Sequence, residues 1–236
     1  MIVYGRNVAE EFLNNKNKVK KVKKVILQVG FRDNLLNSLI ENCKLPVVYK
    51  DKFEISRLAN GNHQGIMLDI EDYKFANLED IISDDEDSLI VVLDHLEDPH
   101  NVGAIIRTAE AAGVLGIIMP HDRSCGINST VMKTSAGALE NIKICEVINL
   151  VNTLKILKDK GYWIIGTDME ESTDYRKINY KGKTVLVLGS EGEGMNRLVK
   201  ETCDFIAKIP MYGMTNSLNV SVAAGILIYE AIRNRK

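Results

Sequence analysis

Three polar segments contain the residues that could do chemistry, and each one follows a stretch predicted to be a strand. The first covers residues 93–113 and includes Asn101 and Arg107. A buried strand is expected over 89–93, and a helix over 102–112. Because ligands of open α/β sheets bind at the carboxyl ends of strands, the loop between these two elements is a candidate ligand site.

Six residues separate Asn101 from Arg107, which is nearly two helical turns. This spacing lets both side chains share one side of the helix. Arg107 stands out because the remainder of the helix is largely Ala, Ile and Thr. Two plainer interpretations stay open: Asn101 could cap the helix, and Arg107 could be a surface arginine in a salt bridge.

In the second segment, 187–195, three glycines are interleaved with two acidic residues directly after a predicted strand. Glycine allows close backbone approach and positive φ. The spacing matches neither nucleotide-phosphate motif, and the acids would repel a phosphate. A backbone loop around a neutral or cationic ligand fits better, with an ordinary tight turn as the alternative.

The third segment, 209–225, leads from a short strand through a glycine-bearing loop into an apolar helix expected over 218–232. Backbone amides and hydroxyls at such a helix start can bind an uncharged or anionic group. Helix capping by Asn216 or Ser217 is the simpler alternative. The small polar residues gathered at this point are Thr215, Asn216, Ser217, Asn219 and Ser221.

Composition narrows the class of protein. The chain has 236 residues, of which 45% are hydrophobic and 26% charged, with a net charge of −2. These values indicate a globular protein with a substantial core and exclude nucleic-acid binding by bulk charge alone. No signal peptide is expected, and the apolar runs are too short to span a membrane. The four cysteines form no C-x-x-C pair, so we expect a reduced, cytoplasmic protein without a metal site.

Charge is unevenly distributed along the chain. Residues 1–60 hold 12 Lys/Arg and 6 Asp/Glu, a net of +6, with the densest basic run at Lys16–Lys24. Such a run is either a solvated surface or a phosphate contact. Residues 69–87 have a net of −8, which predicts an acidic linker at 73–87 between a domain at 1–72 and a domain at 88–236.

Alternating strands and helices are predicted in both domains. In the first, strands are expected over 25–29, 46–49 and 66–68, with helices over 7–13, 35–40 and 52–59. In the second, apolar strands are expected over 89–93, 116–119, 142–147, 163–166 and 185–188, with a further helix over 150–158. Near-continuous apolar strands argue for an α/β fold whose parallel sheet is covered on both faces.

Together and in this order, the three segments resemble the SpoU/TrmH branch of the SPOUT superfamily of RNA methyltransferases, over Leu89–Arg233. The N-terminal part resembles the substrate-binding domain of one subgroup, with Tyr4-Gly-Arg-Asn near its start and His63-Gln-Gly-Ile near its end. The resemblance implies a C-terminal parallel sheet with a deep trefoil knot, preceded by a small α/β domain like ribosomal protein L30e.

The same resemblance implies a function. Members of the family transfer a methyl group from S-adenosylmethionine to a ribose 2′-OH of RNA, without a metal, and work as homodimers with the site at the interface. The two-domain arrangement favours a guanosine in large-subunit (23S) ribosomal RNA over tRNA. Two rivals are a catalytically silent RNA-binding module and a dinucleotide-dependent enzyme; the second is disfavoured because no G-x-G-x-x-G follows a predicted strand.

Site residues follow from the positions of the family's motifs. Arg107 is implied to remove the hydroxyl proton or, since arginine stays protonated, to stabilise the alkoxide and hold a phosphate. The implied catalytic residues are Asn101, Arg107, Glu191, Ser217 and Asn219. The implied cofactor-binding residues are Leu188, Gly189, Gly192, Ile209, Met211, Ser217 and Leu218.

Overall fold

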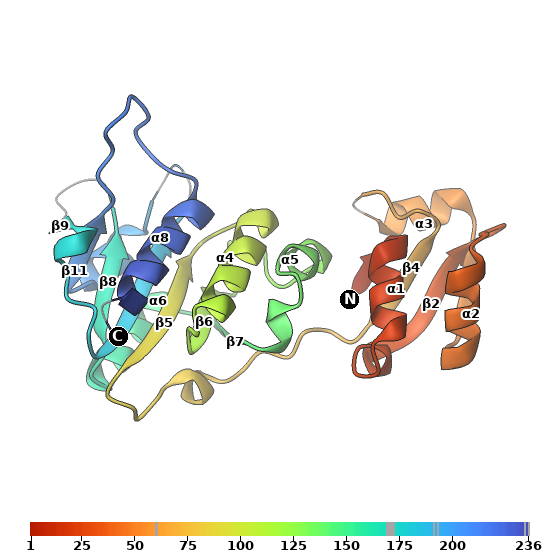
Figure 1. Ribbon diagram of the computed structural model, residues 1–236, viewed down its shortest axis with the longest axis horizontal. Coiled ribbons are helices and arrows are strands. Elements are labelled where there is room, and N and C mark those ends of the chain that lie inside the picture. The colour runs from red at the N-terminus through yellow and green to blue at the C-terminus, as the bar shows by residue number, and fades with distance from the viewer. Residues whose placement is uncertain (60, 169–172, 191, 193, 234, 236) are drawn as a thin grey trace. The chain divides into compact units, whose positions relative to one another are not determined.

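The computed structural model describes residues 1–236 apart from 60, 169–172, 191, 193, 234 and 236. Contacts divide the chain into two compact units, Met1–Lys74 and Phe75–Lys236. The backbone has no cis peptide bond among the described residues. Figure 1 shows strands alternating with helices in each unit.

The first unit is a four-stranded sheet with three helices. Strand order is β1-β4-β2-β3, with β4 antiparallel to β1 and β2, and β3 parallel to β2. The expected strands and helices of this unit are present, and the short edge strand β1 was not expected. The elements are β1 (Ile2–Tyr4), α1 (Arg6–Asn14), β2 (Val22–Gln28), α2 (Asn34–Cys43), β3 (Val47–Lys50), α3 (Lys52–Leu58) and β4 (Ile66–Ile70).

The second unit is built on a seven-stranded sheet in which every strand pair is parallel, in the order β7-β6-β5-β10-β8-β11-β9. Its elements are β5 (Ser88–Asp94), α4 (Pro99–Ala111), β6 (Gly116–Pro120), α5 (Ser129–Thr134), β7 (Lys143–Val147), α6 (Leu150–Asp159), β8 (Trp163–Thr167), β9 (Thr173–Asp174), β10 (Lys183–Gly189), α7 (Arg197–Thr202), β11 (Phe205–Lys208) and α8 (Val220–Arg233).

Helices cover both faces of this sheet, so the predicted α/β class is confirmed. Alternate residues of β5, such as Ile90 and Val92, share a buried cluster with Leu154 of α6 and Val199 of α7. Helices α4 and α8 pack against each other in front of the sheet in the view of Figure 1. All seven residues of β5 are buried, as its unbroken apolar run predicts. The trefoil knot and the likeness to ribosomal protein L30e stay predictions.

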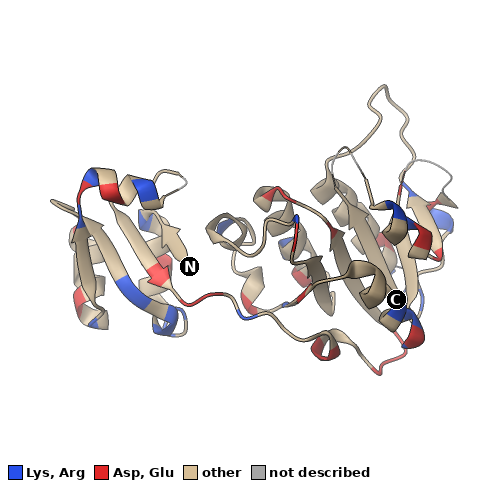
Figure 2. Cartoon of the chain, turned by 180° about the vertical axis from the view of Figure 1, so that it is seen from behind, with Lys and Arg blue, Asp and Glu red and all other residues tan. Residues whose placement is uncertain are grey.

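The acidic segment expected as a linker at 73–87 packs on the second unit between residues 76 and 81. Residues 78–81 form a short 3-10 helix, and Ile81 is fully buried in the core of the second unit. The Ala76 N–H donates to the Ile144 carbonyl at 2.8 Å, and Lys143 Nζ donates to the Asp80 carbonyl at 2.7 Å. The reason is that apolar residues are interspersed among the acids, and charge counting alone passed over them. Figure 2 marks the acidic residues that follow β4.

Two helix starts were also predicted wrongly. Helix α4 begins at Pro99 and not near Asn101, because the Asp98 carboxylate accepts from the His100 N–H at 2.8 Å and caps the helix. Helix α8 begins at Val220, and the Asn219 side chain accepts from the Ser221 N–H at 3.0 Å. The capping residues are therefore Asp98 and Asn219.

Close packing between α4 and α5 generates a prediction about stability. A Cβ added at Gly103 would overlap Thr134 Oγ1 and lie 3.1 Å from the Val131 carbonyl oxygen. Gly103→Ala should therefore lower the free energy of unfolding by about 1–3 kcal/mol, measured by chemical denaturation. Gly213→Ala is the matched control, since a Cβ there has open space and no left-handed φ. Equal stability of the two variants would contradict the tight contact.

Candidate functional site

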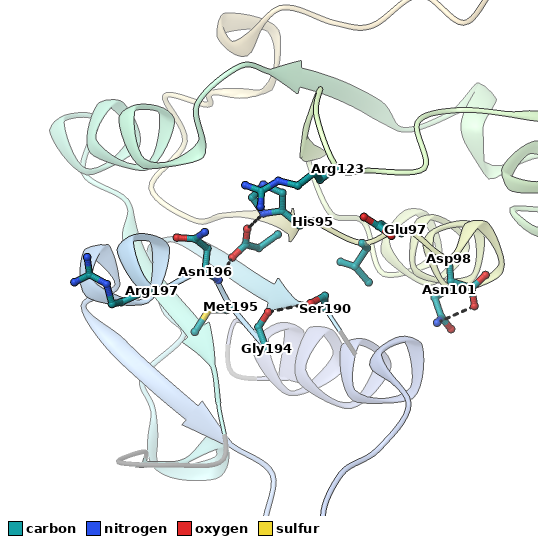
Figure 3. A pocket seen from close by; sticks show the side chains of 12 residues that line it. His95, Glu97, Asp98, Asn101, Arg123, Ser190, Gly194, Met195, Asn196 and Arg197 are labelled. Carbon is teal, nitrogen blue, oxygen red and sulfur yellow. Dashed lines mark hydrogen bonds and ion pairs between the residues drawn. The ribbon is translucent and has the colours of Figure 1, made fainter. Parts of the chain in front are cut away.

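A pocket of about 570 Å³ lies at the carboxyl ends of the two central strands, β5 and β10. These strands are neighbours in register, with Asp94 opposite Gly189. The chain leaves β5 toward β6 on one side and leaves β10 toward β11 on the other, so the pocket sits at a topological switch point of the sheet. Figure 3 shows the twelve lining residues: Asp94, His95, Leu96, Glu97, Asp98, Asn101, Arg123, Ser190, Gly194, Met195, Asn196 and Arg197.

A chain of side-chain hydrogen bonds joins the first and third sequence segments. Asn219 Nδ2 donates to Asn101 Oδ1 at 2.9 Å, and Asn101 Nδ2 donates to Asp98 Oδ2 at 3.1 Å. Both ends of this chain cap helices, since Asp98 caps α4 and Asn219 caps α8. Asn101 is buried although it lies in the first turn of its helix. These hydrogen bonds therefore fix the starts of α4 and α8 against each other, although Asn101 and Asn219 are 118 residues apart in sequence.

Arg107 occupies a different side of α4 from Asn101. Its side chain is exposed, whereas Asn101 is buried, so the expectation that both share one side of the helix was wrong. Six residues correspond to about 600° of helix rotation, which leaves the two side chains about 120° apart. Within the described part of the chain, the Arg107 guanidinium makes no hydrogen bond or ion pair, so it is not the salt-bridged arginine considered above.

The second segment forms a tight loop at the end of β10. The N–H groups of Ser190 and Gly194 each donate to the other residue's carbonyl, at 2.9 and 3.0 Å. A Cβ at Gly189 would overlap the Gly194 backbone, and Gly192 has a φ of +93°, so glycine is required at both positions. Leu188 is buried in β10. Glu191, the expected acid of this loop, lies outside the described residues.

The third segment runs from β11 to α8 and presents its side chains to solvent. Ile209 and Met211 are half-buried, and Ser217 and Leu218 are exposed. Residues 209–219 contain no charged side chain. None of these four residues lines the pocket. The structure therefore brings Asn101 together with Asn219, and it does not bring the expected cofactor residues of this segment into the pocket lining.

A buried carboxylate and a half-buried histidine, which the sequence did not predict as site residues, lie together in the pocket. Asp94 is fully buried, its Oδ1 contacts His95 Nδ1, and its Oδ2 accepts from the Asn196 N–H at 2.6 Å. His95 has a φ of +57°, which is rare for a residue other than glycine and typical of a constrained site. The signal was available, since both residues directly follow a strand predicted to be buried.

The thiols near the site are not nucleophiles. Burial, reinforced by the charge of Asp98, raises the pKa of Cys125 to about 11, and burial raises the pKa of Cys203 to about 12. Both thiols are therefore protonated at neutral pH. Among the described residues no cluster of His, Cys, Asp and Glu could hold a metal ion, and no helix is long and apolar enough to cross a membrane.

Breaking the hydrogen-bonded chain should destabilise the second unit. Asn101→Ala leaves the Asn219 amide without its Asn101 acceptor and removes a donor to Asp98, which should cost about 1–3 kcal/mol in chemical denaturation. Asn141→Ala is the control, because Asn141 is exposed and donates to Glu110 at the surface, where a loss within about 0.5 kcal/mol is expected. Equal losses of unfolding free energy in the two variants would show that these hydrogen bonds do not contribute to stability.

Comparison with known proteins identifies the family. The SpoU rRNA Methylase family matches residues 88–229, and the family described as RNA 2′-O ribose methyltransferase substrate binding matches residues 2–76. A Staphylococcus haemolyticus protein assigned by name to the TrmH family of tRNA/rRNA methyltransferases is 40% identical over 242 residues, covering 100% of this chain and 96% of that protein.

Two solved structures are similar as well. The AdoMet-bound rRNA methyltransferase of Sinorhizobium meliloti is 28% identical with a TM-score of 0.73, covering 98% of this chain and 86% of that one. The TrmH/SpoU tRNA modifying enzyme of A. aeolicus is 37% identical with a TM-score of 0.58, covering 66% and 80%. The chain therefore belongs to the SpoU/TrmH family of RNA methyltransferases, whose methyl donor is S-adenosylmethionine.

Proposed function

We propose that this enzyme methylates a ribose 2′-OH of RNA, with a guanosine of large-subunit ribosomal RNA as the target. The observation that carries the proposal is the Asn219–Asn101 hydrogen bond, which joins the first and third family segments at the edge of a pocket. The name of the family matched by residues 2–76, RNA 2′-O ribose methyltransferase substrate binding, supports the ribose as the acceptor.

The share of this chain that each solved structure covers favours ribosomal RNA over tRNA as the substrate. The Sinorhizobium meliloti rRNA methyltransferase aligns with 98% of this chain and so includes the N-terminal unit. The A. aeolicus tRNA modifying enzyme aligns with 66%. Methylation of tRNA is the second candidate function, because about two thirds of this chain is similar to that enzyme.

The loop after β10 and the segment 209–219 have a composition that suits the binding of S-adenosylmethionine. Its sulfonium supplies an activated methyl group, so the protein has to bind, orient and manage one proton. The uncharged segment 209–219 and the acidic loop after β10 suit a ligand with a net positive charge. We assign binding to the backbone of Leu188, Gly189, Gly192 and Ile209, and to Met211, Ser217 and Leu218. Met211 and Leu218 offer apolar side chains to the ligand.

Arg107 is assigned to the acceptor side of the reaction. In the transfer, the ribose oxygen would bond to the methyl carbon as the bond between that carbon and the sulfonium sulfur breaks, with the neutral thioether as leaving group. The hydroxyl proton would pass to solvent, so that negative charge develops on the ribose oxygen. An exposed guanidinium that binds no other described residue can stabilise that charge and hold the neighbouring phosphate. Asn101, Glu191, Ser217 and Asn219 are assigned to orienting the ribose and the arginine by hydrogen bonds. Positioning of the two reactants is the larger share of the expected rate gain.

A second copy of the chain is proposed to complete the site. Helix α8 exposes Val222 and Tyr229, 51% and 53% accessible, seven residues apart on one face. This helix packs against α4, which carries Arg107, so a partner that covers the apolar face of α8 would lie close to the arginine. A homodimer through this face agrees with the expectation from the sequence.

Methyl transfer tests the function directly. Wild-type protein with labelled S-adenosylmethionine should modify unmodified ribosomal RNA but not total tRNA, and nucleoside analysis should yield 2′-O-methylguanosine. Arg107→Ala should keep cofactor binding in calorimetry and lose turnover by at least ~10²-fold. Lys155→Ala, an exposed cation on α6, is the control with full turnover. Label in tRNA alone would reverse the substrate assignment, and full activity of Arg107→Ala would remove the arginine from catalysis.

Dimerisation has its own test. Val222→Lys places a charge in the apolar face of α8 and should convert a dimer into monomers in sedimentation, with loss of turnover. Ile148→Lys is the matched control, since Ile148 is 94% exposed outside this helix and its replacement should change neither property. A wild-type monomer with full activity, or an active Val222→Lys monomer, would refute the shared site.

A further inference from the structure

Outside the methyl-transfer site, loops meet at one edge of the sheet of the first unit. Strands β1 and β2 end at this edge and β4 begins there, as the pairs Tyr4–Met67 and Leu27–Ile66 show. Strand β3 runs parallel to β2 and ends at the same edge. The two N-terminal motifs of the sequence, at 4–7 and 63–66, belong to these loops, and catalysis does not account for them.

Direct contacts join the two motifs. The Gly5 N–H donates to the Ile66 carbonyl at 3.2 Å, and the Arg6 N–H donates to Gln64 Oε1 at 2.7 Å. Gly65 has a φ of +81°, and a Cβ there would lie 3.0 Å from the Phe31 ring. These residues therefore form one continuous surface with the loop that follows β2.

An arginine on this surface is held by an aromatic ring and a carboxylate. Arg6 Cζ lies 5.3 Å from the centroid of the Phe31 ring, and Arg6 Nη1 lies 3.2 Å from Asp33 Oδ2. Asp33 also caps α2 by accepting from the Leu36 N–H at 3.1 Å, so its position is fixed. The Arg6 side chain remains 46% exposed, and its Nε–H donates to none of the described residues.

A second cation adjoins the first. The Arg32 carbonyl accepts from Arg6 Nη2 at 3.5 Å, while the exposed Arg32 guanidinium makes no hydrogen bond or ion pair with any residue that the structure describes. Exposed amide side chains flank the pair. We name this surface the arginine edge; it consists of Arg6, Phe31, Arg32, Asn62 and Gln64.

The lysine-rich segment lies at the opposite edge of the same sheet. Residues 16–21 precede β2, whose first residue, Val22, pairs with Ile70 at the end of β4. Acids offset part of its charge, because Lys18 pairs with Glu11 at 2.6 Å and Lys24 with Asp69 at 3.4 Å. Figure 2 shows basic and acidic residues together in this unit.

We propose that the arginine edge, and not the lysine segment, is the place where the first unit binds an unpaired nucleotide of its RNA substrate. The inference rests on the proposed function as an RNA methyltransferase. The forked guanidinium groups suit a phosphate, the Arg6–Phe31 pair offers a stacking surface for a base, and the amides can pair with base edges. Unpaired RNA is favoured because the bases of an A-form duplex cannot stack on protein side chains.

Binding of the full chain to two labelled RNAs tests this: a hairpin with an open loop and a fully paired duplex of the same composition. Arg6→Ala/Arg32→Ala should weaken hairpin binding by about 10-fold, lower the salt slope by about 2 and change duplex binding little. Lys20→Ala/Lys23→Ala is the matched control at the opposite edge, with two exposed cations removed and nearly unchanged hairpin affinity.

Two further variants separate recognition from folding. Arg32→Ala removes a side chain with no described partner, so it should lower hairpin affinity without changing the melting temperature. Arg6→Lys keeps the charge but not the flat fork, and should recover only part of the affinity. The inference would be overturned if Lys20→Ala/Lys23→Ala lowered hairpin affinity more than Arg6→Ala/Arg32→Ala does. It would also be overturned if the arginine variant lost hairpin and duplex affinity equally, and in both cases the proposed function would stay intact. A wild-type chain that transfers methyl groups but binds neither RNA would also overturn it.

Discussion

The hydrogen bond between Asn101 and Asn219 is the contact on which the site depends. It joins α4, the first α-helix of the second unit, to α8, the last. Asp98, which caps α4, and Asn219, which caps α8, both bond to Asn101. The Asn101 amide is buried and would be costly to leave without partners, so these hydrogen bonds set the relative position of α4 and α8. Arg107 and the loop before α8 take their places from those two helices.

The parallel sheet brings a second pair of loops together at the pocket. Because β10 inserts beside β5, loops that are about 95 residues apart in the chain end at the same edge, with the Asp94–His95 pair between them. The glycines after β10 let the backbone fold back on itself at this point. The result is a pocket with backbone groups on one wall and fixed polar side chains on the other, which suits catalysis by orientation.

The two units differ in net charge. The second unit, Phe75–Lys236, has a net charge of −6, because residues 88–236 are neutral overall and the acidic segment before them belongs to the same unit. The first unit carries the basic excess, and its cations occupy two opposite edges of one sheet. Acids pair with Lys18 and Lys24 in the lysine segment. Asp33 pairs with Arg6, whose guanidinium also lies against the Phe31 ring, whereas the Arg32 guanidinium pairs with none of the described residues. A count of charges along the chain cannot tell these two situations apart.

The sequence by itself determined the class of fold, most of the strands and helices, and the family, because buried parallel strands are continuous apolar runs and because the motifs depend on short local spacing. It did not reveal that Asp98, rather than Asn101, caps α4, or that Asn219, rather than Asn216 or Ser217, caps α8, since several small polar residues compete for each cap. Nor did it show that Ile81 belongs to the core, or that Arg107 faces away from Asn101. Those outcomes depend on which residues distant in sequence pack together, and only the tertiary structure decides that.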